Sequence, residues 1–379
     1  MKEWFEREKS VYIQFYRRQP VVFVRGEGCW LYDVEGKRYL DMVAGIAAVA
    51  IGHCHPRFVK RVSEQLEKLV HVSNLYYTIP QIELAEKLKE ITGMDRFFFC
   101  NSGAEAVEAS LKIARKVTGR KKFVAFSGSF HGRTMGALSV TWKEKFRKPF
   151  EPLIQPVEFA EFNNASDLEK RVDEETAAVI LELVQGEAGI YPASKDFIRE
   201  IFRLRDEYRF LVIFDEVQTG FGRTGRWFAK DHYGVKPDIM AMAKAMGSGF
   251  PIGGVGVTES VAERLEAGEH ASTFGGNPLA CVASLATIEV IEEEKLVENS
   301  ERMGKYLREK LEKLGIEEVR GMGLMVGARV ENAPSVVSKC LEKGLLVNAP
   351  ADNALRFVPP LVIGKEEIDF AVEILSSLI

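Results

Sequence analysis

The sequence has few of the features that mark secreted, membrane-spanning or polyanion-binding proteins. Its five cysteines are scattered and odd in number, and they offer no disulfide framework. The 51 basic residues are matched by 55 acidic ones, and a net charge of −4 lacks the basic excess that nucleic acids favour. No segment reaches the roughly 18 consecutive apolar residues of a membrane span. Residues 1–9 mix both charge signs where a secretory signal would be apolar. We therefore expect a cytoplasmic protein that binds neither membrane nor nucleic acid.

The sequence does contain enough hydrophobic residues to form a large core. Its 379 residues are 46% hydrophobic, which is ordinary for a globular protein and predicts two or three folding units. Residues 21–42 resemble a small antiparallel meander, and strands alternate with helices from residue 97. From about residue 295 the helical and strand patterns indicate a smaller carboxyl-terminal domain.

The most informative stretch is residues 210–247. An apolar run at 210–214 ends at Asp215, as a buried parallel strand ending in an acid would. Because ligands of open α/β sheets bind beyond the carboxyl ends of the strands, Asp215 is a site candidate. Lys244 is the only charge among the apolar and small residues 239–247, where burial would lower its pKa and free its amine as a nucleophile. The two residues either hold a common cofactor or are ordinary structural residues.

Two further strand ends carry polar or aromatic groups. A strand at 178–181 ends in Glu182, and Glu187 follows it closely. A strand at 123–126 leads to Phe130, which could stack on a flat ring, and to Arg133, which could bind a carboxylate through its guanidinium. Each residue taken singly is more often structural. Repeated polar strand ends nevertheless favour one shared crevice.

The turn at residues 101–105 has two interpretations. Ser102 and Glu105 match a capping box, which needs no ligand. Alternatively, the hydroxyl of Ser102 and the backbone amides of Gly103 and Ala104 could bind a phosphate at a helix start, where the helix dipole favours an anion. The local residues do not decide between the two.

Residues 220–225 read GFGRTG and match the dinucleotide-binding fingerprint. In that fold the first glycine directly follows the strand, whereas five residues separate Gly220 from the expected strand at 210–214. The acid that follows, Asp238, precedes an apolar run instead of closing a second strand. A nicotinamide-dependent oxidoreductase is therefore the alternative of a different class, and it leaves Lys244 unexplained.

The triplet His53-Cys54-His55 could suggest a metal. Adjacent positions do not easily reach one ion, and no second ligand cluster supports a metal site. We expect a loop-packing role for the triplet and no metal.

Taken in order, these motifs resemble those of the class III pyridoxal-phosphate-dependent aminotransferases. The resemblance covers nearly the whole chain and is specific in combination, although single motifs are not. It rests on the segments 101–106, 130–133, 185–187, 215–220 and 272–278, and on Lys244. Within the family, residues 45–47, 52–56 and 71–77 are most similar to members that act on N-acetylornithine.

The resemblance implies a fold-type I architecture of the α/β class. We expect a large domain with a mostly parallel central sheet and helices on both faces, and a smaller α+β domain built from the N- and C-terminal segments. The expected divisions are an N-terminal segment at 1–50, a large cofactor-binding domain at 51–290 and a small C-terminal domain at 291–379. The family also implies a homodimer whose active sites are shared between subunits.

The resemblance assigns the cofactor pyridoxal 5′-phosphate to residues already singled out. Lys244 would hold the cofactor covalently and then move the proton during the reaction. Asp215 would keep the pyridine nitrogen protonated so that the ring can accept electrons. The remaining contacts implied are ring stacking by Phe130, a bond to the phenolic oxygen from Gln218, phosphate binding by Ser102, Gly103 and Ala104, and a phosphate contact by Thr273 from the partner subunit.

The substrate contacts implied are Arg133, Tyr16 and Ser272, with Arg133 binding the α-carboxylate. Glu187 and Arg356 would form a switch, in which Arg356 is paired with Glu187 while an ω-amino donor reacts and is freed to bind the α-carboxylate of L-glutamate. The implied reaction converts N-acetyl-L-ornithine and 2-oxoglutarate into N-acetyl-L-glutamate 5-semialdehyde and L-glutamate, a step of arginine biosynthesis.

Two positions depart from the family pattern, and several substrates fit it. Leu183 stands where the family usually has proline, and Ile46 stands where ornithine aminotransferases tend to have tyrosine, which favours an N-acylated substrate. An acylated or carrier-linked lysine is one methylene longer, a difference worth only about 1–3 kcal/mol in a pocket. That substrate, free ornithine and 4-aminobutyrate stay open, as does a cofactor-binding protein that keeps the fold without turnover.

Overall fold

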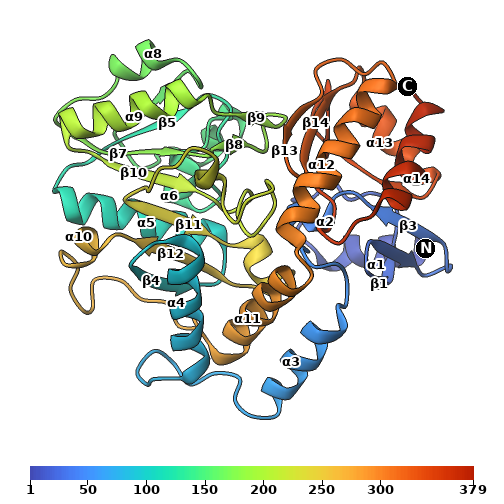
Figure 1. The fold of residues 1–379 in the computed structure, drawn as a ribbon, viewed down its shortest axis with the longest axis horizontal. Coiled ribbons are helices and arrows are strands. Elements are labelled where there is room, and N and C mark those ends of the chain that lie inside the picture. Colours follow the sequence, from blue (N-terminus) through green and yellow to red (C-terminus); the bar gives the residue numbers. More distant parts are fainter.

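The computed structural model describes residues 1–379, and a seven-stranded sheet forms its centre (Figure 1). Strand β12 is antiparallel to both its neighbours, and the other pairs are parallel. In spatial order the strands are β4 (Arg96–Cys100), β12 (Gly253–Val257), β11 (Ile239–Met242), β10 (Leu211–Asp215), β7 (Thr176–Leu181), β5 (Lys122–Phe126) and β6 (Val157–Ala160).

Helices cover both faces of this sheet because its strands are apolar on both sides. In β5, Phe123 and Ala125 join a core cluster with helix α5 (Gly103–Thr118), whereas Val124 and Phe126 join a second cluster with helix α9 (Lys195–Tyr208). Successive side chains of a strand point to opposite faces, so the two clusters lie on opposite sides of the sheet. This arrangement leaves the carboxyl edge of the sheet free to carry the site.

The two ends of the chain are joined in a second sheet. Strand β15 (Leu345–Leu346) pairs in parallel with β3 (Arg38–Asp41), which is preceded by β2 (Trp30–Asp33) and β1 (Phe23–Glu27). In Figure 1 the blue N-terminal strands accordingly lie beside the orange and red C-terminal elements. A third sheet has the order β13 (Arg320–Met322), β14 (Met325–Arg329), β17 (Ala354–Phe357) and β16 (Asn348–Ala351). The fold-class prediction is confirmed by this arrangement.

Helices and short elements complete the chain. The expected division at residue 290 falls inside α11, whose bounds are Pro278–Glu293. The other helices are α1 (Lys2–Val11), α2 (Ala44–Ala47), α3 (Pro56–Leu66), α4 (Ile79–Thr92), α6 (Met135–Ser139), α7 (Glu144–Arg147), α8 (Ala165–Glu169), α10 (Glu259–Ala262), α12 (Leu296–Lys313), α13 (Ala333–Glu342) and α14 (Lys365–Ser376), with a two-stranded sheet of β8 (Val184–Gln185) and β9 (Tyr191–Pro192).

The pair Gly253-Gly254 is of a kind more typical of loops, but it belongs to a strand. Gly253 and Gly254 begin β12, a fully buried strand between β4 and β11. A Cβ atom on Gly253 would lie 2.5 Å from the carbonyl oxygen of Ser102. The glycine is thus needed where the strand passes the start of α5, a close approach that composition alone does not reveal.

Three other residues singled out in the sequence, His53, His55 and Leu183, have plain structural roles. His53 and His55 have different carboxylate partners, Asp41 at 2.8 Å and Glu294 at 2.9 Å. Leu183 is buried in the core, and its carbonyl oxygen accepts from the backbone N–H of Ala193. No helix has the length and apolar character needed to cross a bilayer.

Candidate active site

A cavity of about 440 Å³ opens at the carboxyl edge of the central sheet, where the polar strand ends meet. Its walls come from segments far apart in the chain, and they include the cofactor-binding residues expected within one subunit. Among its lining residues are Ser102, Gly103, Ala104, Phe130, His131, Arg133, Glu182, Asp215, Val217, Gln218 and Lys244. The structure therefore brings together in one space residues from segments as far apart in the chain as Ala48 and Ile252.

The start of helix α5 forms one wall. The hydroxyl of Ser102 accepts from the backbone N–H of Glu105 at 3.2 Å, so the expected cap is present. The carboxylate of Glu105 accepts from the N–H of Asn101 at 2.8 Å rather than from that of Ser102. The N–H groups of Gly103 and Ala104 have no partner within the chain. The cap and an anion site are thus compatible, because the cap leaves these first-turn donors free.

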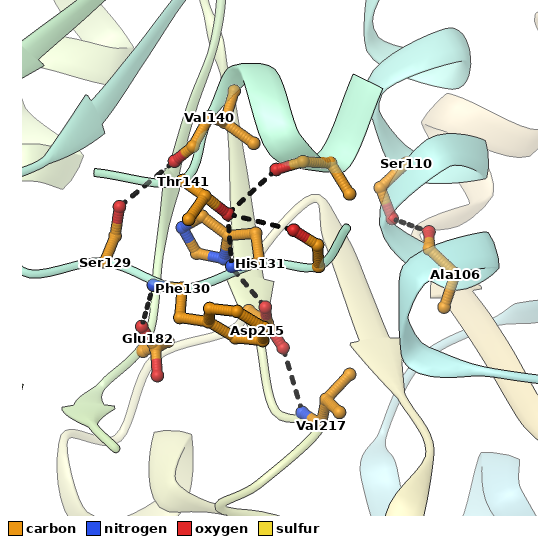
Figure 2. Close-up of polar contacts among 12 residues, drawn as sticks. Ala106, Ser110, Ser129, Phe130, His131, Val140, Thr141, Glu182, Asp215 and Val217 are labelled. Carbon is orange, nitrogen blue, oxygen red and sulfur yellow. Dashed lines mark hydrogen bonds and ion pairs between the residues drawn. The ribbon is translucent and has the colours of Figure 1, made fainter. Parts of the chain in front are cut away.

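Asp215 is fixed at the base of the cavity by two donors. His131 donates through Nδ1 to Oδ2 of Asp215 at 2.7 Å, and the backbone N–H of Val217 donates to Oδ1 at 3.1 Å (Figure 2). Both side chains of the His131–Asp215 pair are buried. The Nε2 atom of His131 has no partner. A buried carboxylate held in this way can stabilise a positive charge that lies close to it.

Glu182 connects two loops of the site and was not among the expected site residues. Its Oε1 accepts from the backbone N–H of Phe130 at 2.9 Å, and its Oε2 accepts from that of Gly186 at 3.0 Å. Figure 2 shows the contact with Phe130. Burial raises the pKa of Glu182 to about 7. Its place at the end of an apolar strand was the sequence signal that could have identified it.

Lys244 follows strand β11 and starts a short 3-10 turn, Lys244–Gly247. Its φ of 47° is in the left-handed region, which is uncommon for a residue with a side chain and is found disproportionately at functional sites. The amine makes no hydrogen bond or ion pair with the rest of the chain. Burial, and then the charge of Arg356, lower the pKa of Lys244 to about 8. The amine is therefore more nucleophilic near neutral pH than that of an ordinary lysine.

Arg133 lies at the cavity wall and has no carboxylate partner in the chain. Its guanidinium carbon lies 3.5 Å from the ring centroid of Phe146, a residue of α7 that the sequence interpretation missed. Partial desolvation lowers the pKa of Arg133. An unpaired guanidinium held against an aromatic ring is well placed to bind a carboxylate.

Arg356 and Glu187 form the expected ion pair next to the cavity. Nη1 of Arg356 lies 2.6 Å from Oε1 of Glu187 and 3.5 Å from Oε1 of Gln218, which lines the cavity. Nη2 of Arg356 donates to Oδ1 of Asn348 at 2.7 Å. The side chain of Arg356 is 1% exposed. The charge of Arg356 lowers the pKa of Glu187 despite burial.

Besides Glu187 and Arg356, which lie next to the cavity, three expected site residues do not line the cavity of their own subunit. Tyr16 is 71% exposed and lies in a separate hollow with other N-terminal residues. Ser272 and Thr273 line another hollow, beside Leu75 and Phe98. Ser272 is nevertheless linked to the cavity wall, because its Oγ accepts from the side chain of Asn101 at 3.3 Å. Contacts of Tyr16 and Thr273 with a ligand in this cavity are not made within one isolated chain.

The dinucleotide-like segment 220–225 has a structural role instead. It follows β10 as a series of turns, and no helix begins in it. Arg223 is fully buried and donates to the carbonyl oxygens of Leu324 and Pro359. The segment thus joins the central sheet region to the C-terminal elements, and the nicotinamide interpretation is wrong.

Comparisons with known proteins agree with this geometry. The family model for class-III aminotransferases matches residues 12–379. The chain belongs to this family. It is 68% identical to the acetylornithine aminotransferase of Archaeoglobus fulgidus, covering 99% of this chain and 100% of the relative. It is 48% identical to that of Methanocaldococcus jannaschii, over 100% of this chain and 98% of the relative.

Solved structures of aminotransferases have the same fold. The ornithine aminotransferase of Toxoplasma gondii superposes with a TM-score of 0.95 at 32% identity, covering 99% of this chain and 93% of that one. The acetylornithine aminotransferase of Elizabethkingia anophelis gives a TM-score of 0.87 at 32% identity, covering 99% and 98%. Class-III aminotransferases depend on pyridoxal phosphate, and this chain is an aminotransferase that uses that cofactor.

The residues of the cavity fit this cofactor. Free N–H donors at the start of α5 suit its phosphate, the buried Asp215 suits its pyridine nitrogen, and Lys244 offers an amine for its aldehyde. Gly103 faces Val217 so closely that a Cβ atom on Gly103 would lie 2.7 Å from Cγ1 of Val217. A side chain at residue 103 would therefore displace Val217 or the start of α5, and glycine preserves the shape of the phosphate end of the cavity.

Proposed function

We propose that this aminotransferase transfers the amino group of N-acetyl-L-ornithine to 2-oxoglutarate, giving N-acetyl-L-glutamate 5-semialdehyde and L-glutamate. The observation that carries the proposal is the contrast between two arginines at the site. Arg133 is unpaired, whereas Arg356 is paired with Glu187. Arg133 is thus ready to bind the single carboxylate of N-acetylornithine. Arg356 becomes available for a substrate with two carboxylates, such as L-glutamate.

The names of the relatives support the same substrate. The A. fulgidus and M. jannaschii proteins are both named acetylornithine aminotransferase. The proposed reaction belongs to arginine biosynthesis. We also propose a cytoplasmic location, which the five free thiols of the chain favour.

In this proposal, each residue of the cavity has a defined task. The cofactor, when bound, withdraws electrons from the substrate carbon that bears the amine. Lys244 binds the cofactor and then carries the proton from that carbon. Asp215, held by His131, stabilises the positive charge on the pyridine nitrogen. Phe130 and Gln218 line the cavity, where Phe130 would hold the ring by stacking and Gln218 would bind the phenolic oxygen.

The phosphate and carboxylate ends of the site lie at different walls. Ser102, Gly103 and Ala104 bind the phosphate. The backbone amides of Gly103 and Ala104 are free, and the hydroxyl of Ser102 turns to the phosphate from Oε2 of Glu105, to which it donates at 3.1 Å. Arg133 binds the carboxylate of N-acetylornithine. For L-glutamate, Glu187 turns away and Arg356 binds the α-carboxylate, which compensates the buried guanidinium that would otherwise be left unpaired.

We also propose that the protein forms a homodimer. Leu75 and Tyr77 are 82% and 96% exposed, and Tyr76, Ile79 and Phe274 are also exposed in the same region of the chain as Thr273. An apolar surface of this kind favours association. A second copy seated there would allow Thr273 to reach the neighbouring subunit's cavity. We expect Leu75→Glu with Tyr77→Glu to give monomers in sedimentation velocity, whereas Tyr191→Glu, a control at another exposed aromatic, should leave the dimer intact.

The experiment that tests the substrate is a comparison of single half-reactions. Purified enzyme is mixed with N-acetylornithine, ornithine, an acylated lysine with a free side-chain amine, or 4-aminobutyrate, and conversion of the cofactor is followed by its absorbance. N-acetylornithine should give the highest specificity constant. A higher value for ornithine would favour the activity for which the T. gondii structure is named, and a higher value for lysine or 4-aminobutyrate would also overturn the proposal.

The same preparation tests the cofactor attachment. Borohydride reduction followed by peptide mapping should place the label on Lys244, and label on another lysine would contradict its role. If none of the amines converts the bound cofactor to its amine form, the protein keeps the fold without catalysing transamination.

A further inference from the structure

The buried guanidinium of Arg356 has two close side-chain partners of different kinds, besides the amide of Gln218 at 3.5 Å. One is the carboxylate of Glu187 at 2.6 Å, and the other is the neutral amide of Asn348 at 2.7 Å. The two contacts use different nitrogens, Nη1 and Nη2. These two close contacts therefore hold Arg356 through both terminal nitrogens, and only one of the two partners, Glu187, is charged.

The two partners also differ in how firmly the backbone holds them. Asn348 is directly opposite Arg356 in the antiparallel pair β16–β17, so the strand register places the two side chains on the same face. Glu187 lies in the turn after β8, and its side chain is 26% exposed. When Glu187 turns away, Asn348 stays in position because the sheet fixes its backbone.

We propose that Asn348 is a positioning and specificity-determining residue, which holds the guanidinium of Arg356 in the orientation needed to receive the second carboxylate of a dicarboxylic substrate. The inference rests on the proposed function, in which Arg356 serves L-glutamate and 2-oxoglutarate but not N-acetylornithine.

The neutral charge of Asn348 is essential to this role. A carboxylate at residue 348 would neutralise Arg356 permanently and would repel an incoming carboxylate. An aliphatic residue would leave Nη2 without its acceptor and would free the guanidinium to rotate. The neutral amide of Asn348 satisfies Nη2 while leaving the positive charge for the substrate.

The test compares Asn348→Asp and Asn348→Leu with the wild-type holoenzyme. Binding of glutarate, a five-carbon dicarboxylate without an amine, is measured by titration calorimetry, and the half-reactions with L-glutamate and N-acetylornithine are measured separately. Both variants should weaken glutarate binding by about tenfold or more, the size expected for a hydrogen bond to a charged group. The half-reaction with N-acetylornithine should change by less than about threefold, because a substrate with one carboxylate does not use Arg356.

A matched control places the same charge on the same hairpin. Asn353→Asp lies in the exposed turn between β16 and β17, and its side chain makes no hydrogen bond. Its glutarate affinity should equal that of the wild type. Equal losses in both half-reactions together with a lower melting temperature would show that Asn348 is merely structural, and unchanged glutarate binding in both variants would also overturn the inference.

Arg356→Gln separates this inference from the proposed function. If Arg356→Gln weakens glutarate binding and the Asn348 variants do not, only the inference on Asn348 fails. If Arg356→Gln leaves glutarate binding unchanged, the assignment of Arg356 in the proposed function fails with it.

Discussion

The imidazole of His131 holds the carboxylate of Asp215, with Nδ1 2.7 Å from Oδ2 and both groups buried. The other carboxylate oxygen accepts from the backbone N–H of Val217 at 3.1 Å. Each oxygen thus has one donor, and the carboxylate is fixed before any ligand binds. Such preorganisation is useful where a positive charge on the cofactor must be stabilised without rearrangement.

The first prediction concerns the charge of Asp215. In Asp215→Asn, only one side-chain oxygen remains to accept, and the amide presents N–H groups to a donor. We expect the rate constant of the half-reaction with L-glutamate to fall roughly 10²- to 10³-fold, the size typical for loss of one preorganised electrostatic group. Stopped-flow absorbance spectroscopy measures this rate constant. Asp206→Asn, at an exposed acid of α9, is the control and should react at the wild-type rate. A normal rate in Asp215→Asn would contradict the role of Asp215.

The second prediction concerns the pH at which the apoenzyme takes up its cofactor. Attack by Lys244 requires the neutral amine, and burial lowers the pKa of Lys244 from 10.5 to about 8. The amine is protonated below this pKa and neutral above it. The rate of covalent uptake of pyridoxal phosphate should therefore rise with pH and reach half its limit near pH 8.

The measurement is the growth of the cofactor's visible absorbance after mixing with apoenzyme across a pH series. Lys244→Arg serves as the control and should show no such growth. A midpoint close to the ordinary lysine value of 10.5 would show that the amine is not desolvated in solution.

Local sequence patterns were sufficient to predict the strand ends and the helix start of the site. The apolar run before Asp215, the isolated charge of Lys244 and the small residues after Ser102 are all signals contained within ten or so positions. The prediction of β10 was correct to within one residue, because a fully buried strand leaves a continuous apolar run.

Pairings between distant residues could not be predicted in this way. The contact of His131 with Asp215 depends on the loop after β5 reaching the end of β10, and the contact of Asn348 with Arg356 depends on strand register. Neither leaves a local pattern. Strand β12 was missed because its glycines are required by close packing against Ser102, whereas glycine in a sequence is more typical of loops. The placement of Tyr16 and Thr273 in hollows apart from the cavity leaves no local pattern either.

The third prediction uses the contact between Gly103 and Val217. A Cβ atom at residue 103 would lie 2.7 Å from Cγ1 of Val217, so Gly103→Ala must displace Val217 or the start of α5. Overpacking of this kind costs about 1–3 kcal/mol. We expect cofactor affinity, measured by fluorescence titration of apoenzyme, to fall at least about tenfold.

A second substitution tests whether that clash is the cause. Val217→Ala removes the two methyl groups that Gly103→Ala would meet, so the double variant should recover most of the affinity. If the double variant binds the cofactor as weakly as Gly103→Ala alone, the loss would have to come from elsewhere in the first turn of α5.

The fourth prediction concerns the aromatic ring that supports Arg133. The guanidinium carbon of Arg133 lies 3.5 Å from the ring centroid of Phe146, an arrangement worth about 0.5–2 kcal/mol. In Phe146→Leu, the guanidinium loses this support and becomes freer to move. The KM for N-acetylornithine should rise about 3- to 30-fold while kcat changes little, because the carboxylate contact serves binding and not the chemical step.

Two further variants separate the ring's π-face from its bulk. Phe146→Tyr keeps the aromatic face and should retain the wild-type KM, since a tyrosine ring also attracts a cation. Phe150→Leu removes an exposed ring from the same segment and should have no effect. If kcat fell instead of KM rising, or if Phe146→Tyr were as impaired as Phe146→Leu, Phe146 would be acting through packing of α7 and not by positioning the guanidinium that binds the substrate.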